Sequence, residues 1–177
     1  MKDNKGFSLI EVIIVIAIFA IVTAGAGISV NMIQKANVSK GMREVDNGLD
    51  KLVNECLSKS APTYMYIYQD EDKDYYIKFS KDKYNNIAAV IADSGTKTFI
   101  EKNKTTLYWE SKSSGSDAIY SNHFVYITFD KSTGSCVAYR AGGTRINDIT
   151  AIKASRSGRA ATVSIAYETG KHSFVEA

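Results

Sequence analysis

Glu11 is the residue whose surroundings most need a chemical explanation, because it is the one charged side chain in the apolar run from Gly6 to Val22. Placing a lone carboxylate inside a membrane segment costs about 2.5 to 3.5 kcal/mol on insertion scales. That cost falls when an opposite charge comes close. We therefore expect Glu11 to have a cationic partner. The alternative is that its side chain extends to the lipid headgroups from near the membrane face.

The residues before Glu11 provide that partner. Gly6 follows a short charged leader and is followed by the aromatic Phe7 and the apolar run. This order resembles the type III signal of type IV prepilins and the related pseudopilins. The resemblance implies that a prepilin peptidase cleaves after Gly6 and methylates Phe7, which makes Glu11 the fifth mature residue. An ordinary secretory cleavage site at 24–27 is the alternative, and it leaves Glu11 without a use.

Cleavage after Gly6 places a protonated amine on Phe7, close to Glu11 in the chain. The start of a helix is already electropositive and attracts anions. An identical helix, shifted along the axis, can bring its own Glu11 beside this amine, so that each buried charge is neutralised by the next copy. We expect this pair to set the axial register of a filament.

The apolar run is long enough to cross a bilayer. Residues 7–30 supply the roughly twenty apolar residues that a spanning helix needs. Lys2 and Lys5 favour a cytoplasmic location for the leader, residues 1–6, so we expect residues 31–177 to form an extracytoplasmic domain. Many filament-forming relatives carry a proline where this chain has Ile28. This difference favours a minor pilin over an abundant major subunit.

A second apolar pattern follows the membrane segment. Apolar residues recur at steps of three and four between charged ones, which is typical of an amphipathic helix with one covered face. They are Met42, Val45, Leu49, Leu52, Val53 and Cys56. Pro62 disfavours a helical conformation for the residue before it. We predict one helix over residues 7–58, whose first half protrudes.

The remaining chain predicts β-structure in short β-branched or aromatic segments bounded by turn residues. The expected strands are 75–79, 87–91, 98–101, 105–109, 124–129, 136–140, 161–167 and 172–175. Hairpin connections are expected at 103–104, 130–134 and 168–170. Strand 124–129 is rich in large side chains and should be central, with one face on the helix. The fold class is therefore α+β, and the resemblance implies the pilin fold, in which the C-terminal half of the long helix packs on an antiparallel sheet.

Size and composition fit one extracytoplasmic domain. The chain has 177 residues, 45% of them hydrophobic, and a formal net charge of +3. Cys56 and Cys136 lie in the part expected outside the cytoplasm, where disulfides persist. A bridge between them and a pair of buried thiols are both compatible with the sequence.

The sequence offers little for catalysis. Asp70, Asp72 and Asp74 have the spacing that opens a calcium loop, but the glycine and the closing glutamate of such a loop are absent, which favours a solvated acidic turn. His123 and His172 lack neighbours at zinc spacing. Nucleophile elbows, phosphate loops and paired catalytic acids are also missing from the sequence. We predict a protein without catalytic residues, bound metal or cofactor.

Basic residues cluster late in the chain. Arg140, Arg145, Lys153, Arg156 and Arg159 lie within twenty residues that contain one acid, Asp148. Such a cluster can contact DNA phosphates, and each contact adds salt-dependent affinity. A solvated face or a contact with acids of a neighbouring subunit is the more common role, and the balanced charge of the chain does not by itself indicate a nucleic-acid partner.

These patterns together predict a pilin-like structural subunit. Its expected partners are other pilin subunits, the prepilin peptidase and methyltransferase, and the pilus assembly machinery in the membrane. The minor pilin of a type IV pilus is our first hypothesis, and the alternative is a pseudopilin of a type II secretion or DNA-uptake system. A membrane-anchored binding domain with an accidental likeness to prepilins is the hypothesis from another class.

Overall fold

The structure is a computed structural model that describes residues 8–58, 61–102 and 104–176, without the side chains of residues 25–31. The chain divides into two compact units, Met1–Lys35 and Ala36–Ala177. Helix α1 runs from Leu9 to Ser58 and belongs to both units. It contains no proline, since the one proline of the chain, Pro62, follows its end. The predicted long helix is therefore confirmed over the described residues.

Two antiparallel sheets form most of the second unit. We call the six-stranded sheet, with strand order β3-β2-β1-β6-β7-β8, sheet A, and the five-stranded sheet, with strand order β11-β10-β9-β4-β5, sheet B. The strands of sheet A are β1 (Tyr64–Gln69), β2 (Tyr75–Ser80), β3 (Lys97–Glu101), β6 (Val125–Phe129), β7 (Cys136–Arg140) and β8 (Arg145–Ile146). Those of sheet B are β4 (Thr106–Ser111), β5 (Gly115–Ile119), β9 (Ile149–Arg156), β10 (Arg159–Ala166) and β11 (Lys171–Glu176).

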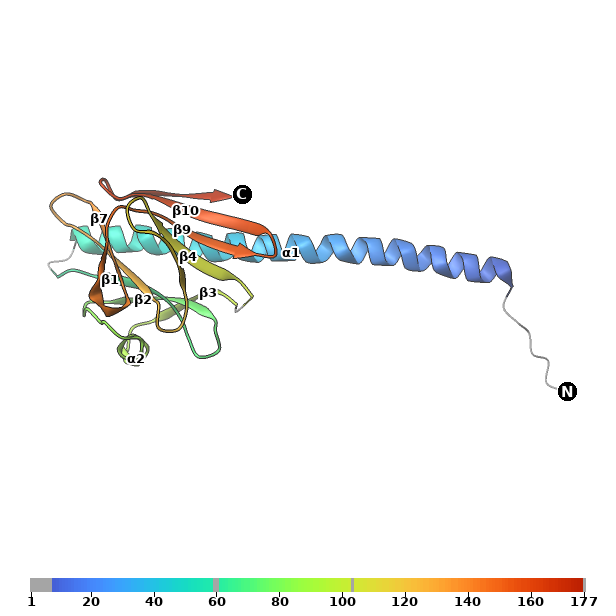
Figure 1. The fold of residues 1–177 in the computed structure, drawn as a ribbon, viewed down its shortest axis with the longest axis horizontal. Helices are drawn as coiled ribbons and strands as arrows, with labels where there is room; N and C mark the ends of the chain where they lie inside the picture. Colours follow the sequence, from blue (N-terminus) through green and yellow to red (C-terminus); the bar gives the residue numbers. More distant parts are fainter. Residues whose placement is uncertain (1–7, 59–60, 103, 177) are drawn as a thin grey trace. The chain divides into compact units, whose positions relative to one another are not determined.

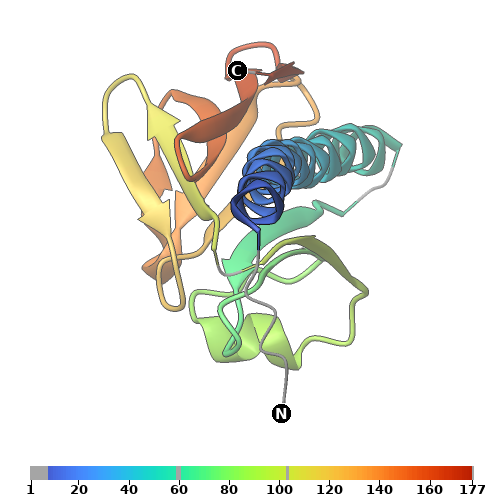
Figure 2. The ribbon, with the colours of Figure 1, turned by 90° about the vertical axis from the view of Figure 1, so that its right-hand side faces the viewer.

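The C-terminal half of α1 packs against both sheets. Five of the six apolar residues predicted to form its covered face are at most 3% exposed: Met42, Val45, Leu49, Leu52 and Cys56. They share one buried cluster with Ile67 and Ile127 of sheet A and Ile152 and Val163 of sheet B. Figure 2 shows this arrangement along the helix, with the green strands β1 and β2 on one side and the orange-red strands β10 and β11 on another. The sheets and this half of the helix thus share one core. Figure 1 shows the strands gathered around the C-terminal half of α1.

The outer face of sheet A carries a second, aromatic cluster. Tyr66, Tyr68 and Tyr126 are buried there with Phe124 and Val90. Val90 belongs to the short helix α2 (Ile87–Ala92), which covers this face. A 3₁₀ turn at Ala141–Gly143 joins β7 to β8. Alternating side chains of β1 therefore pack on opposite faces of sheet A. Met65 and Ile67 belong to the cluster that contains α1, whereas Tyr66 and Tyr68 belong to the cluster that contains α2.

Several local predictions need correction. Residues 87–91 were expected to form a strand but form α2, because the Asn86 side chain accepts a hydrogen bond from the Ala89 N–H and caps a short run that contains three alanines. The connection at 103–104 is not a hairpin, since β3 lies in sheet A and β4 in sheet B. We expected one antiparallel sheet, and the structure has two. The hairpins at 130–134 and 168–170 are confirmed, and the predicted strand 124–129 is confirmed as β6, between β1 and β7.

The helix approaches sheet A closely at Gly41. A Cβ atom at this position would lie 2.7 Å from the backbone oxygen of Ile100 in β3. Backbone oxygens cannot move aside as a flexible side chain can, so part of β3 would have to shift. The glycine is therefore required by packing, although it lowers helix propensity.

We expect Gly41→Ala to destabilise the second unit by about 1 to 2 kcal/mol, because strain from overpacking exceeds the roughly 1 kcal/mol that alanine adds to helix propensity. Urea unfolding of the full chain in an uncharged detergent measures the effect. Asn47→Ala is the matched control, because Asn47 is an exposed residue of the same helix and its replacement should be neutral or slightly stabilising. Stabilisation by Gly41→Ala would contradict the close packing.

Candidate functional site

Glu11 lies in the first turn of α1 and helps to form the start of the helix. Its Oε2 accepts a hydrogen bond of 2.8 Å from the Ser8 N–H. The Ser8 Oγ in turn accepts a hydrogen bond from the Ile10 N–H at 3.3 Å. This reciprocal arrangement is a variant of the capping box, and it holds the carboxylate at the electropositive end of the helix. Sequence reasoning missed the role of Ser8, which the spacing Ser8-x-x-Glu11 could have indicated.

The N-terminal part of α1 exposes apolar side chains on all sides. Eleven of them are between 44% and 79% exposed: Leu9, Ile10, Val12, Ile13, Ile14, Val15, Ile16, Ile18, Phe19, Ile21 and Val22. The hydroxyl of Thr23 bonds to the Phe19 carbonyl oxygen at 2.8 Å, so this polar group is satisfied within the helix. An apolar surface of this extent marks a contact with a membrane or another protein.

Within the described residues, no helix is both long enough and apolar enough to be a membrane span. The predicted processing residues, Gly6 and Phe7, lie outside the described residues. The part of the candidate site that the structure describes therefore begins at Ser8 and continues into α1.

The two cysteines are free, buried thiols in the structure. Cys56 contributes to the helix face and its Sγ donates to the Thr63 carbonyl oxygen at 3.5 Å. Cys136, at the start of β7, is 5% exposed, and burial raises the pKa of its thiol to about 12.

We expect a thiol reagent at pH 8 to leave Cys136 unmodified in the folded protein. A thiol with a pKa of about 12 is ionised to only about one part in ten thousand at that pH, and the thiolate is the reactive form. Unfolding in guanidinium should then expose both cysteines to the same reagent, as mass spectrometry of the labelled chain measures. An unfolded, unreduced chain that takes up no label would instead show that the two residues form a disulfide.

The five predicted basic residues come from both sheets. Lys153 pairs with Glu110 at 2.7 Å, and Arg156 pairs with Glu101 at 3.5 Å. Arg159 lies opposite Arg156 in the β9–β10 hairpin. Arg140 and Arg145 lie in β7 and β8 of sheet A, and Arg140 lines a hollow that does not include the other four. Two of the five charges are thus neutralised within the chain, and the others are divided between the two sheets.

The remaining candidate residues have structural partners. The Asp70 Oδ1 accepts hydrogen bonds from the N–H groups of Asp72 and Asp74, which is the geometry of a tight acidic turn. In the described parts of the chain, His, Cys, Asp and Glu residues form no group of three or more that could hold a metal ion. His172 lies 3.2 Å from Asp50, and this contact joins β11 to α1. His123 stacks on Tyr120, with ring centroids 4.0 Å apart.

Comparison with known families identifies the N-terminal segment. The model of the prokaryotic N-terminal methylation motif matches residues 1–27, which include Gly6, Phe7, Ser8 and Glu11. No curated protein and no solved structure matches the chain. The matched residues contain the helix start that Ser8 and Glu11 form and most of the exposed apolar run. This match supports a type IV pilin-like protein.

Proposed function

We propose that this protein is a minor pilin, a structural subunit of a type IV pilus or a pilus-like filament. The observation that carries the proposal is the exposed apolar half of α1, which has the hydrogen-bonded Glu11 in its first turn and lies largely within the residues that the methylation motif matches. A helix with this surface is unstable alone in water. A bilayer before assembly and a bundle of similar helices afterwards both cover it.

Glu11 has a specific role in this proposal. A prepilin peptidase removes residues 1–6, and methylated Phe7 then carries the N-terminal amine. In the filament the carboxylate of one subunit neutralises the amine of the next, which excludes other axial registers because each of them leaves two buried charges unpaired. Subunits that rise along an axis at each contact generate an open helical filament and not a closed ring.

The remaining parts of the chain follow from this arrangement. We propose that residues 7–30 span the cytoplasmic membrane before assembly and form the filament core afterwards, and that residues 31–177 form an extracytoplasmic domain with the pilin fold. Assembly machinery supplied by other proteins extracts the subunit. The two sheets are then displayed on the filament surface, where they provide contacts with partners.

The position of Ile28 supports a minor subunit, because proline is frequent there in filament-forming relatives. A pseudopilin of a type II secretion or DNA-uptake system has the same N-terminal features and is the second candidate. DNA is a weaker candidate partner, since Lys153 and Arg156 are paired with acids of the same chain.

Shearing filaments from the cell surface tests the proposal. A minor pilin should be recovered in the sheared fraction in its processed form and in a much smaller amount than the main subunit, as quantitative mass spectrometry measures. A pseudopilin should instead remain with the cell envelope and copurify with secretion components. Recovery of only unprocessed chain in the membrane would contradict both assignments and favour a membrane-anchored binding domain.

A further inference from the structure

A hollow of about 520 Å³ lies in the second unit, between α1 and β3. Three basic side chains line it: Lys40 of α1, Lys102 just after β3, and Arg156 at the end of β9. The apolar side chains of Phe99 and Ile100 form part of its wall. Phe99 is 45% exposed, so the hollow has an uncovered apolar edge beside its charges.

The charges around this hollow are only partly compensated. Glu101 is 4% exposed. Its Oε1 accepts one hydrogen bond from the backbone N–H of Lys102 at 2.9 Å and lies 3.5 Å from Nη1 of Arg156. The carboxylate of Glu101 is therefore occupied by groups inside the hollow. Among the described residues, no carboxylate lies within 4 Å of the ammonium group of Lys40 or Lys102, although Glu44 also lines the hollow.

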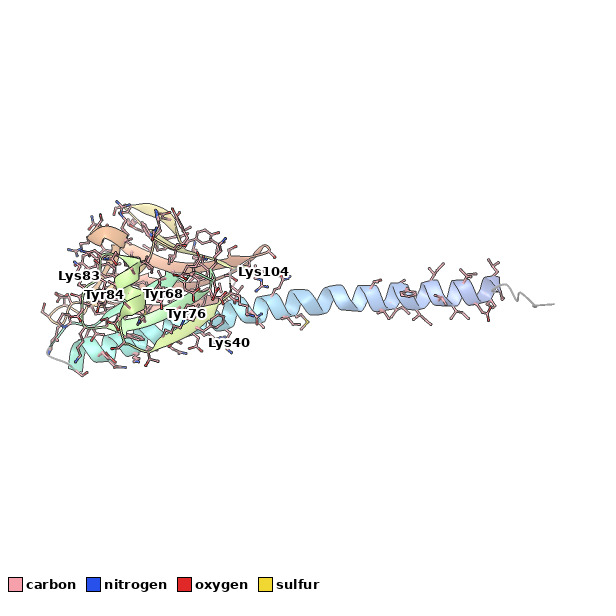
Figure 3. The ribbon with its side chains drawn as sticks, turned by 90° about the horizontal axis from the view of Figure 1, so that it is seen from below. Lys40, Tyr68, Tyr76, Lys83, Tyr84 and Lys104 are labelled. Atoms are coloured by element: carbon pink, nitrogen blue, oxygen red, sulfur yellow. The ribbon has the colours of Figure 1, made fainter. Side chains whose placement is uncertain are left out.

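More positive charge surrounds this hollow. Figure 3 shows Lys40 and Lys104 at the same end of the second unit, whereas Lys83 and Tyr84 lie at the other end. Arg159 is exposed and opposes Arg156 across the β9–β10 hairpin. The acidic turn at Asp70–Asp74 does not line the hollow, and Asp70 lies 4.0 Å from Lys97. The local excess is thus positive at the end where the chain enters the second unit.

Chain length keeps this end near the membrane that residues 7–30 are proposed to cross. Asn37 lines the hollow and is seven residues from residue 30 in the sequence. A chain of seven residues reaches at most about 25 Å even when it is fully extended. When residues 7–30 cross the bilayer, the hollow therefore lies within reach of the lipid headgroups on the outer surface.

We propose that this hollow binds the headgroup of an anionic phospholipid while the subunit waits in the membrane. Lys40 and Lys102 contact the phosphate, and the exposed ring of Phe99 contacts the upper part of the acyl chains. Basic pockets beside membrane helices bind anionic headgroups by this chemistry, and each nearby Lys or Arg adds to the affinity for an anionic surface. The contact holds the second unit in one orientation at the membrane before extraction. It rests on the proposed function, since a chain that never enters a membrane has no headgroup to bind.

Lysine labelling in vesicles tests this proposal. The full chain, produced together with a prepilin peptidase, is reconstituted into vesicles of phosphatidylcholine alone or with about one third phosphatidylglycerol. A membrane-impermeant amine reagent then modifies exposed lysines, and mass spectrometry measures each site. We expect labelling of Lys40 and Lys102 to fall about threefold or more with phosphatidylglycerol and to recover in high salt, because the attraction is screened. Lys81 and Lys83 are internal controls and should be unchanged.

Two further arms separate the sources of phosphate. In micelles of an uncharged detergent, neither millimolar inorganic phosphate nor double-stranded DNA should protect Lys40 and Lys102; protection by either would overturn the assignment to lipid. A double variant, Lys40→Gln with Lys102→Gln, should copurify with less phosphatidylglycerol than Lys81→Gln with Lys83→Gln. Equal lipid content in the two variants would also overturn it. The N-terminal mass of the same samples reports processing, so unprotected lysines in a chain with methylated Phe7 refute the headgroup site alone.

Discussion

Glu11→Gln should abolish incorporation into filaments while leaving processing and folding intact. Glutamine keeps an oxygen that accepts the hydrogen bond of the Ser8 N–H, so the start of α1 is preserved. It removes the negative charge, which leaves the ammonium group of the neighbouring subunit buried without a partner. An uncompensated buried charge of this kind costs about 3 to 5 kcal/mol. We expect incorporation to fall by about a hundredfold or more, as quantitative mass spectrometry of sheared filaments measures.

Ser8→Ala is the matched control for this variant. It removes the hydroxyl that accepts a hydrogen bond from the Ile10 N–H but keeps the carboxylate of Glu11. The loss of such a cap costs about 1 kcal/mol of helix stability. Ser8→Ala should therefore assemble nearly normally. Assembly of Glu11→Gln at the level of the natural chain would show that the charge pair does not set the register. Failure of Ser8→Ala as complete as that of Glu11→Gln would show that assembly needs the capping interaction and not the charge.

Lys78→Met should destabilise the second unit by about 3 kcal/mol, because it removes a buried donor that holds α2 on sheet A. Lys78 lies in β2 and is 3% exposed. Its Nζ donates to the carbonyl oxygens of Val90 at 2.9 Å and Ile91 at 3.1 Å, and also to that of Asp93. These carbonyls form the electronegative end of α2, where a cation is favourable.

Methionine retains the apolar stem of Lys78 but leaves these carbonyls without their donor. Urea unfolding of the full chain in an uncharged detergent, followed by fluorescence of the buried Trp109, measures the loss. Lys97→Met is the control, because Lys97 is 56% exposed and lies 4.0 Å from its partner Asp70. Such a surface pair contributes at most about 1 kcal/mol. Equal effects of the two substitutions would refute the role assigned to the Lys78 hydrogen bonds.

Much of α1 could be predicted from the sequence, because its signals are local and regular. The apolar positions Met42, Val45 and Leu49 repeat with the helical period, and all three are fully buried. Pro62 limits the helix near its observed end at Ser58. The same reasoning located β2 and β6, whose β-branched and aromatic residues are typical of strands.

The sheet arrangement was harder to predict, because it depends on contacts between distant residues. β3 and β4 are neighbours in the chain but lie in different sheets, and no turn residue indicates that separation. α2 contains the β-branched residues of a strand, and the Asn86 cap together with packing on the tyrosines determines its helical form. β5 (Gly115–Ile119) has small and polar residues, and pairing with β4 is what orders it as a strand.

The candidate site was partly predictable for the same physical reasons. Glu11 is conspicuous because a charge inside an apolar run is costly, whereas Ser8 is an ordinary residue until its hydrogen bonds are considered. The basic residues near the C-terminus are close in the chain, but Arg140 lies in sheet A and Arg156 lies in sheet B, where it pairs with Glu101. Proximity in the sequence therefore does not show which of these charges are neutralised within the chain.

The mass of the mature N-terminal peptide tests the central claim most directly. The account predicts that the chain recovered from cells begins at Phe7 and carries one methyl group on its amine, with residues 1–6 removed. Tandem mass spectrometry of the N-terminal peptide measures both features together. A mature chain that begins beyond residue 24 would contradict the account, because it would have lost Glu11. A chain that retains the leader in cells with an active prepilin peptidase would also contradict it, because Phe7 would then carry no free amine for Glu11 to neutralise.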